Sequence, residues 1–387
     1  MVLAILFLAR TVVAFQFQSV AAVNTSLVPE LSIDYATLGT LVGLYMLPGV
    51  VLAIPGGVLG HRFGDKRVAL WGAALMLAGG GVVAASHAPV LLGLGRIVSG
   101  SGAVLLNILL AKMITDWFGE REIVLAMAIF VTSWPLGIGL ALVALASLAA
   151  VLSTQFALWT TAAACACAFL LIAAYRVPPG LASAPVTAKV SLDRREWSLS
   201  LLSGCVWALF NVAFAIVPVF GPAFMATGGV PAATAAATIS LTMWVTILSL
   251  PLGGWIAQHV GARDLLMYGC FAAMLLVLIG MARLLAPAVA CILFGVLAGP
   301  PPGLIMAMPA QALRPQNRAT GMGVYYAVYY LSMTALMPVA GALRDATGNA
   351  AMPLYFAAAL LTGAAGALWA FRLIQRAGGA RSRRASA

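Results

Sequence analysis

The sequence predicts an all-α polytopic membrane protein whose twelve transmembrane helices form two pseudo-symmetric six-helix bundles. Of its 387 residues, 63% are hydrophobic and only 8% are charged, which a water-soluble protein of this length does not tolerate. The apolar residues fall into twelve runs of about 20 residues, the length that crosses a bilayer as a helix. When these runs are threaded through a membrane, 17 of the 21 Lys and Arg residues lie on one side.

The even number of spans places both termini on the same side, and the positive-inside rule makes that side cytoplasmic. The loops of the other side keep only Arg283 and Arg344 as basic residues. We expect retention of the first helix and a bacterial-type cytoplasmic (inner) membrane. The expected spans are 3–24, 37–59, 67–86, 89–113, 122–147, 154–175, 200–222, 233–257, 265–284, 287–311, 319–341 and 351–373.

The net charge of +11 is explained by basic residues that anchor loops at an anionic cytoplasmic leaflet. Nucleic-acid binding is therefore not expected. The five cysteines lie inside apolar runs, without disulfide or metal-site spacing. No phosphate-binding Walker loop is present, which excludes direct ATP drive by this chain. We expect a monomer in the lipid bilayer without a cofactor or a bound metal.

The longest polar interruption lies between spans six and seven and divides the chain into equal halves. The sequence therefore predicts an N-terminal six-helix bundle over 1–175, a cytoplasmic linker over 176–199 and a C-terminal six-helix bundle over 200–374. A basic cytoplasmic tail over 375–387, rich in Gly, Ser and Ala, is expected to be disordered.

The loop after the second span recurs in both halves. A shift of 197 residues superimposes Gly56 on Gly253 and Gly64 on Gly261, which indicates an internal repeat of six helices. Its glycines permit sharp turns and close helix approach, and its basic residues are expected to pair with carboxylates of the neighbouring half. We expect a gating role for Gly56, Gly60, Arg62, Gly64, Asp65, Arg67, Gly261 and Arg263.

With this loop, the sequence resembles the major facilitator superfamily of transporters over essentially its whole length. Gly95, Arg96 and Gly100 in span four are similar to that family's arginine followed by glycines. The resemblance implies two bundles that rock about a central site. In that family this loop usually has an aspartate where His61 stands. The family uses this aspartate in a charge relay that holds the outward-facing state, and the present sequence lacks it.

Shorter strings are similar to the cyanate permease and nitroimidazole transporter branch of that superfamily. They are Gln16-Phe17-Gln18, Leu47-Pro48-Gly49, Asp116-Trp117-Phe118 and Trp134-Pro135.

Only Arg10 and Arg96 are ionisable residues at membrane depth, and no Asp or Glu lies in a predicted span. An intramembrane charge is a functional candidate by default, and two cations without fixed anions favour an anionic substrate. Two structural alternatives stay open, because Arg10 could extend to the headgroups and Arg96 could hold helix ends together. The expected substrate-binding set is Arg10, Gln16, Gln18, Arg96, Asn107, Asn211, Tyr325 and Tyr329.

Prolines mark the expected bends. Pro300, Pro301 and Pro302 should interrupt span ten near its middle, and Trp134 with Pro135 should kink span five. Such a break persists at membrane depth only where protein or water covers it. We expect a gating role for both.

The sequence thus predicts a secondary active transporter that moves a small anionic solute by alternating access. Because the spans lack a carboxylate, uniport, anion exchange and symport with protons all remain open. The alternative is an exporter of drug-like hydrophobic compounds, favoured by apolar and aromatic walls. An enzyme is not expected, since no catalytic constellation is visible. A sensor built on a transporter fold is a further alternative.

Overall fold

The computed structural model describes residues 1–118, 122–177, 192–259, 261–283, 285–314 and 317–385. Within these residues the protein is all-helical, and twelve spans are long and apolar enough to cross a membrane. The predicted fold class and number of spans are therefore confirmed. Most of the expected linker and its Lys189 lie outside the described residues.

The first half of the chain forms eight helices that supply six spans. They are α1 Val2–Ala22, α2 Asn24–Glu30, α3 Tyr35–Leu44, α4 Gly49–Phe63, α5 Asp65–Ala85, α6 Pro89–Trp117, α7 Ile123–Val151 and α8 Thr154–Ala174. Helix α5 packs on α6 and α8, and α1 packs on α7.

The second half forms seven helices that supply the other six spans. They are α9 Arg194–Thr227, α10 Ala232–His259, α11 Arg263–Arg283, α12 Pro287–Leu297, α13 Pro300–Ala312, α14 Arg318–Thr347 and α15 Met352–Ala385. Helix α9 packs on α14 and α15, and α11 packs on α15.

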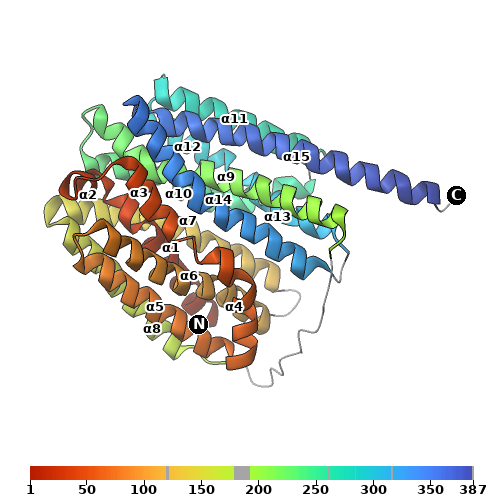
Figure 1. The fold of residues 1–387 in the computed structure, drawn as a ribbon, viewed down its shortest axis with the longest axis horizontal. Helices are drawn as coiled ribbons and strands as arrows, with labels where there is room; N and C mark the ends of the chain where they lie inside the picture. Colours follow the sequence, from red (N-terminus) through yellow and green to blue (C-terminus); the bar gives the residue numbers. More distant parts are fainter. Residues whose placement is uncertain (119–121, 178–191, 260, 284, 315–316, 386–387) are drawn as a thin grey trace.

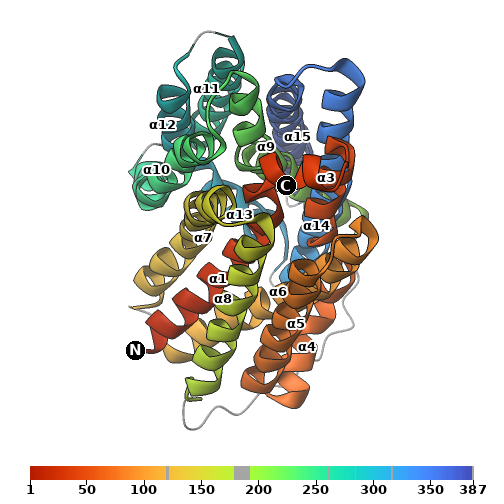
Figure 2. The ribbon, with the colours of Figure 1, turned by 90° about the vertical axis from the view of Figure 1, so that its left-hand side faces the viewer.

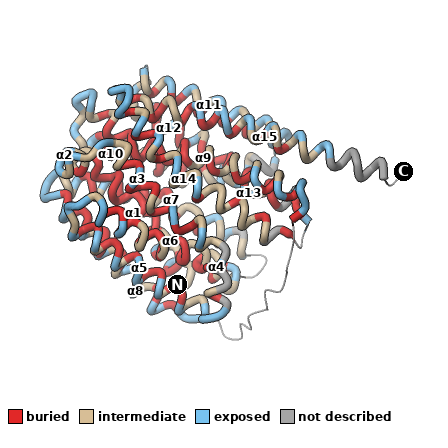
Figure 3. The backbone as a smooth tube through the Cα atoms, in the orientation of Figure 1, coloured by how far each residue is buried: buried red, intermediate tan, exposed pale blue. Residues whose placement is uncertain are grey.

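The two halves lie side by side and meet along a few helices. In Figure 1 the red-to-yellow half lies below the green-to-blue half, and Figure 2 shows the same separation after a quarter turn. Helix α3 crosses the interface to pack on α14, and α7 packs on α10. Buried residues fill the interior of both bundles (Figure 3), whereas the outer faces carry large apolar side chains such as Leu265 and Trp369, as a lipid-facing surface does.

Spans two and ten each consist of two helices. In span two, α3 ends at Leu44 and α4 begins at Gly49 after a turn that contains Pro48. In span ten, α12 ends at Leu297 and α13 begins at Pro300. The interruption therefore precedes the three prolines, because proline is well accommodated in the first turn of a helix, where no backbone donor is needed.

The carbonyl group freed at the break in span ten is bonded by the neighbouring helix. The hydroxyl of Ser249 on α10 donates to the Gly295 carbonyl at 2.7 Å, and Thr246 donates to the same oxygen at 3.4 Å. Gly253 lies against the break, since a Cβ atom at this position would come within 2.5 Å of the Pro300 nitrogen. Protein groups thus cover this irregular backbone at membrane depth.

Two boundaries differ from the expected domain limits. Helix α9 begins at Arg194, inside the expected linker, because Asp193 and Glu196 form a capping box at its first turn. Helix α15 continues to Ala385, through most of the tail that the sequence predicts to be disordered, and it projects beyond the bundles in Figure 1.

Candidate functional site between the two bundles

Polar contacts join the bundles at the end opposite the termini. The side-chain amide of Gln18 on α1 donates to the Pro218 carbonyl of α9 at 2.8 Å. Asn24 on α2 donates to the Val219 carbonyl at 2.6 Å. Both side chains are fully buried. The candidate substrate residue Gln18 is therefore part of the bundle contact in this conformation.

A carboxylate of one bundle also caps a helix of the other. Asp345 near the end of α14 accepts hydrogen bonds from the backbone nitrogens of Tyr35 and Ala36, at 3.2 and 2.7 Å. Asp34 caps the same helix α3 from within by accepting from Thr37 at 2.8 Å. The hydrogen bonds from Thr37 lower the pKa of the Asp34 carboxyl.

Glycines let α3 and α14 approach closely below this cap. A Cβ atom on Gly39 or Gly341 would overlap backbone atoms of the facing helix, and one on Gly43 would lie 2.6 Å from the Thr334 carbonyl. The hydroxyl of Thr334 donates to the Gly43 carbonyl at 3.3 Å. Small residues at such positions are a usual basis of helix association in membranes.

At the end that holds the termini, the described ion pairs connect residues of the same half. Lys112 on α6 pairs with Asp65 at the start of α5, and Arg372 on α15 pairs with Asp264 on α11 at 2.7 Å. Arg62 and Arg67 are exposed and make no ion pair with a described residue. The expected pairing of this loop with carboxylates of the other half is absent from the described contacts of this conformation.

The glycines of the repeated loop have different local roles. Gly64 joins α4 to α5 with a φ of 89°, which favours glycine. Gly60 lies against Asp65, since a Cβ atom would come within 2.5 Å of the Asp65 Oδ1. A Cβ atom on Gly56 would lie 3.1 Å from the Cδ1 atom of Ile108 on α6. Gly261, the counterpart of Gly64 in the second half, and Arg263 are exposed.

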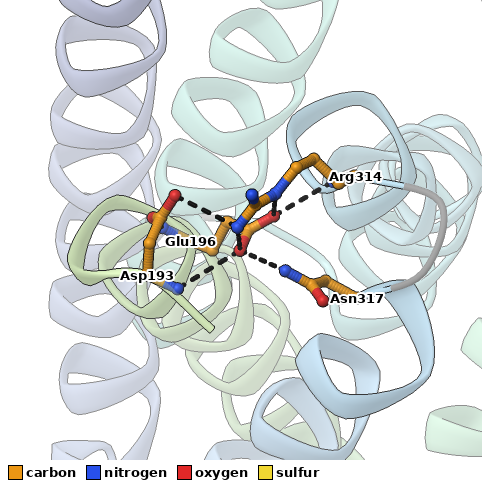
Figure 4. Close-up of polar contacts among 4 residues, drawn as sticks. All are labelled: Asp193, Glu196, Arg314 and Asn317. Atoms are coloured by element: carbon orange, nitrogen blue, oxygen red, sulfur yellow. Dashed lines mark hydrogen bonds and ion pairs between the residues drawn. The ribbon is translucent and has the colours of Figure 1, made fainter. Parts of the chain in front are cut away.

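A further polar cluster, of Asp193, Glu196, Arg314 and Asn317, connects helices of the second bundle at this end (Figure 4). The buried carboxylate of Glu196 on α9 accepts hydrogen bonds from Arg314 Nη2 and Nε at 2.8 and 3.0 Å, and also from Asn317. Asp193 lies 3.3 Å from the same guanidinium. Among the described residues this cluster joins α9 to the connection between α13 and α14, so its contacts lie within the second bundle.

Arg10 lies halfway along the interface and is half-buried. Its Nε donates to Asn107 Oδ1 of α6 at 3.3 Å, and its Nη1 donates to the Phe130 carbonyl and the Ser133 hydroxyl of α7 at 2.9 and 3.4 Å. The guanidinium lies 4.5 Å from the Phe130 ring centroid and 5.8 Å from that of Trp134. Its Nη2 makes no hydrogen bond to a described residue.

Tyrosines on α14, in the second bundle, reach the first bundle. A Cβ atom on Gly49 of α4 would lie 2.3 Å from the Tyr330 ring, and Tyr329 adjoins Tyr330. Arg10 itself bonds α6 and α7 and so does not extend to the headgroups. A positive charge with an unused pair of donors at this interface can bind a carboxylate or another small anion.

Arg96 is sealed inside the first bundle, with an exposed fraction of 1%. Its Nε, Nη1 and Nη2 donate to the backbone carbonyls of Leu41, Gln16 and Phe17, at 3.0, 2.8 and 2.8 Å. Its guanidinium lies 4.4 Å from the ring centroid of Tyr45. This geometry favours the structural alternative for Arg96, because each nitrogen already has a protein partner.

The remaining amides are also engaged with protein groups. Gln16 is buried and donates to the Met76 carbonyl at 2.8 Å and to Ser99 at 3.2 Å. A cavity of about 10 Å³ beside it, lined also by Arg96 and Thr161, has room for roughly one water molecule. Asn211 is half-buried and donates to the Trp207 carbonyl of its own helix at 2.7 Å.

The candidate tyrosines belong to an aromatic cluster of the second bundle. The ring centroid of Trp207 on α9 lies 6.2 Å from those of both Tyr325 and Tyr329. Tyr325 is fully buried, and neither its hydroxyl nor the Trp207 Nε1 has a described hydrogen-bond partner. Tyr329 is half-buried.

Sequence reasoning left Trp207, Phe130 and Ser133 out of the candidate set. A signal for Trp207 was present, because the repeat offset of 197 residues carries Arg10 onto Trp207. No comparable signal identifies Phe130 and Ser133, which are ordinary residues of an apolar helix.

Trp134 links Arg10 to the core of the first bundle. Its ring lies 5.7 Å from that of Phe17 on α1 and beside the Arg10 guanidinium. Pro135 lies inside α7, which continues from Ile123 to Val151.

Comparison with known proteins identifies the architecture. A sequence model of the Major Facilitator Superfamily matches residues 6–336. An uncharacterized transporter of Buchnera aphidicola subsp. Schizaphis graminum (strain Sg) is 34% identical over 67 residues, 17% of this chain and 17% of that protein. The inner membrane transport protein YajR of Escherichia coli (strain K12) is 32% identical over 108 residues, 28% of this chain and 23% of YajR. The matches span less than a quarter of either relative.

Solved structures match over nearly the whole chain. The peptide transporter POT in complex with sulfate superimposes with a TM-score of 0.75 at 16% identity, covering 97% of this chain and 95% of that one. A mutant of POT in complex with sulfate gives the same values. At this identity the likeness establishes a shared fold.

Proposed function

Because the chain belongs to the Major Facilitator Superfamily and is therefore a secondary transporter, we propose that its cargo is a small anionic solute. The carrier works by alternating access in a bacterial-type inner membrane, with both termini in the cytoplasm. Short strings resemble the cyanate permease and nitroimidazole transporter branch, of which cyanate is a small anion and a nitroimidazole is a neutral compound.

The observation that carries this proposal is the position of Arg10. Of the two intramembrane arginines, Arg10 has a nitrogen, Nη2, that is not bonded to a described residue, whereas each nitrogen of Arg96 is bonded. Asn107 and the Phe130 carbonyl orient the guanidinium, so the two N–H groups of Nη2 are pre-positioned. A charge-assisted hydrogen bond from Nη2 to an anion is stronger than a hydrogen bond between neutral groups.

The charge balance supports an anion as the missing partner. All ten Asp and Glu residues lie at span ends or in loops, and no described carboxylate forms an ion pair with Arg10. A charged arginine at the centre of a transmembrane helix costs at least about 2.5 kcal/mol. An anionic substrate reduces this cost while it is bound, and the same lack of carboxylates favours uniport, anion exchange or symport in which protons neutralise the substrate.

The distribution of contacts supports alternating access. The bundles contact each other at the end opposite the termini, through Gln18, Asn24 and Asp345. With the basic end in the cytoplasm, this conformation is the one that faces the cytoplasm. Rocking to the other state breaks these contacts and brings the exposed Arg62 and Arg67 toward the second bundle.

The aromatic cluster around Trp207 favours a second candidate, an exporter of drug-like hydrophobic compounds. Thermal unfolding of the purified protein separates the two. The protein is challenged with nitrate, cyanate, acetate and benzoate, and separately with neutral and cationic hydrophobic dyes.

An anion carrier is stabilised by at least one anion, and this stabilisation is lost in Arg10→Gln. The matched control is Arg283→Gln, which changes an exposed arginine whose described hydrogen bond goes to Tyr355; it should keep the response. Stabilisation by dyes alone, unchanged in Arg10→Gln, contradicts the anion proposal.

A further inference from the structure

Resting on the proposed function, we infer that the preferred cargo is an aromatic monocarboxylate. Its carboxylate accepts a hydrogen bond from Nη2 of Arg10, and its ring packs against the aromatic side chains of α7, α9 and α14.

The surroundings of Arg10 in the first bundle are aromatic as well as charged. Phe130 and Trp134 flank the guanidinium at 4.5 and 5.8 Å from their ring centroids. The polar partners of Arg10 here are Asn107, Ser133 and one carbonyl group. A small inorganic anion would leave its hydration shell and find few replacement donors. A carboxylate on an apolar ring gives up water from one end only.

The second bundle supplies an aromatic wall opposite the charge. Trp207 stacks with Tyr325 at an interplanar angle of 23° and lies beside Tyr329. Tyr329 and Tyr330 adjoin each other at 5.0 Å between ring centroids, and Tyr330 packs against Gly49 of the first bundle, where a Cβ atom would lie 2.3 Å from its ring. Aromatic rings prefer offset-stacked and edge-on neighbours, which these side chains offer to a flat cargo.

The internal repeat gives this arrangement a simple origin. Arg10 and Trp207 occupy the same position in the first helix of each half, one repeat offset of 197 residues apart. At matching positions, the first bundle therefore has the charged side chain of Arg10 and the second bundle has the aromatic ring of Trp207. In inverted-repeat and parallel-repeat carriers the substrate lies between such matching elements.

Two buried donors on the aromatic wall lack an acceptor. The Trp207 Nε1 and the Tyr325 hydroxyl are inaccessible to water and have no described hydrogen-bond partner. An unpartnered buried donor is costly.

The charge inventory limits the cargo to a monoanion. Arg96, the second intramembrane arginine, has each nitrogen bonded to a backbone carbonyl and is sealed within the first bundle. A second negative charge on the cargo would therefore have no cation to meet in this part of the interface.

The test uses calorimetry to measure the binding of a matched set of ligands to the purified full-length protein. The set is benzoate, neutral benzamide, acetate, cyclohexanecarboxylate and the dianion phthalate. We expect benzoate to bind at least tenfold more tightly than each of the others. Trp207→Leu should weaken benzoate binding at least tenfold and leave acetate binding unchanged. Trp369→Leu, which alters an exposed tryptophan on the outer face of α15, should change neither.

A pair of substitutions at Tyr329 separates loss of the aromatic ring from misfolding. Tyr329→Phe keeps the ring and should retain benzoate binding, whereas Tyr329→Leu should weaken it. If acetate or nitrate binds in an Arg10-dependent manner and benzoate has no advantage, this inference is overturned and the anion carrier stands. If none of the anions binds in a manner that depends on Arg10, both proposals fall.

Discussion

The carboxylate of Asp345 caps helix α3 from across the bundle interface, with its Oδ2 2.7 Å from the backbone nitrogen of Ala36. Helix N-termini carry unsatisfied backbone donors and a partial positive charge. Here one bundle supplies the cap for a helix of the other. The contact exists only while this end of the interface is closed, so it acts on the equilibrium between the two states of the carrier.

Replacing Asp345 with alanine should shift that equilibrium toward the state that is open at this end. Loss of a helix cap costs about 1 kcal/mol, which corresponds to roughly a fivefold change in population. Spin labels at the exposed His87 and Asn349, in a protein freed of its native cysteines, report the separation of the bundles.

Asp34→Ala is the matched control, because Asp34 caps the same helix without crossing the interface. It should lower stability and leave the distance distribution unchanged. Equal distributions for Asp345→Ala and the parent protein would contradict the role of this cap.

Gly341→Ala should prevent the close approach of α3 and α14. The added methyl group would overlap the Tyr35 carbonyl, which is backbone and cannot rotate away. We expect the same labels to move apart and transport to slow as the closed state is lost. Gly366→Ala on α15, where a methyl group meets no atom within 4 Å, should raise helix stability slightly and leave the distances as they were. Unaltered packing in Gly341→Ala would show that the glycine contact is dispensable.

Arg96→Lys should destabilise the first bundle severely. A lysine ammonium cannot reach three carbonyls in the planar geometry that the guanidinium satisfies. Breaking a buried charge network costs about 3 kcal/mol or more. The measurement is thermal unfolding in detergent beside Arg283→Lys, an exposed position with one described hydrogen bond. A similar melting temperature for both variants would argue against a structural role for Arg96.

Ser249→Ala should destabilise the break in span ten. The Gly295 carbonyl would retain only the longer contact with Thr246, and interhelical hydrogen bonds in membranes contribute about 0.6 to 2 kcal/mol. Ser198→Ala is the control, since the Ser198 hydroxyl bonds its own helix at Arg194. If both substitutions lower the melting temperature equally, the carbonyl at the break does not depend on Ser249.

Most of the architecture follows from hydropathy, because a lipid-facing helix must be apolar over its whole length. Hydropathy did not predict the split of span two or the short helix α2. Leu47, Pro48 and Gly49 lie in an otherwise apolar run, and a turn there leaves hydropathy unchanged. Helix α2 has seven residues, too few for a periodic pattern to emerge.

The site could be predicted only in part, since residue type does not reveal direction. Arg10 and Arg96 look alike in sequence, but Arg10 is half-buried with its Nη2 not bonded to a described residue, whereas Arg96 is buried with every nitrogen bonded. Gln16 and Gln18 lie two positions apart, so their side chains point to different sides of α1. Gln16 bonds within the first bundle and Gln18 reaches the second.

The central claim is that Arg10 binds the transported anion, and uptake into proteoliposomes tests it most directly. Wild type, Arg10→Gln and Arg283→Gln are reconstituted at equal density after their folding is checked by gel filtration and thermal unfolding. Exchange of a labelled monocarboxylate, with benzoate first, is then followed with the same anion inside. The account predicts equal exchange in wild type and Arg283→Gln, and at least a tenfold loss in Arg10→Gln. Exchange at the wild-type rate in folded Arg10→Gln would contradict it.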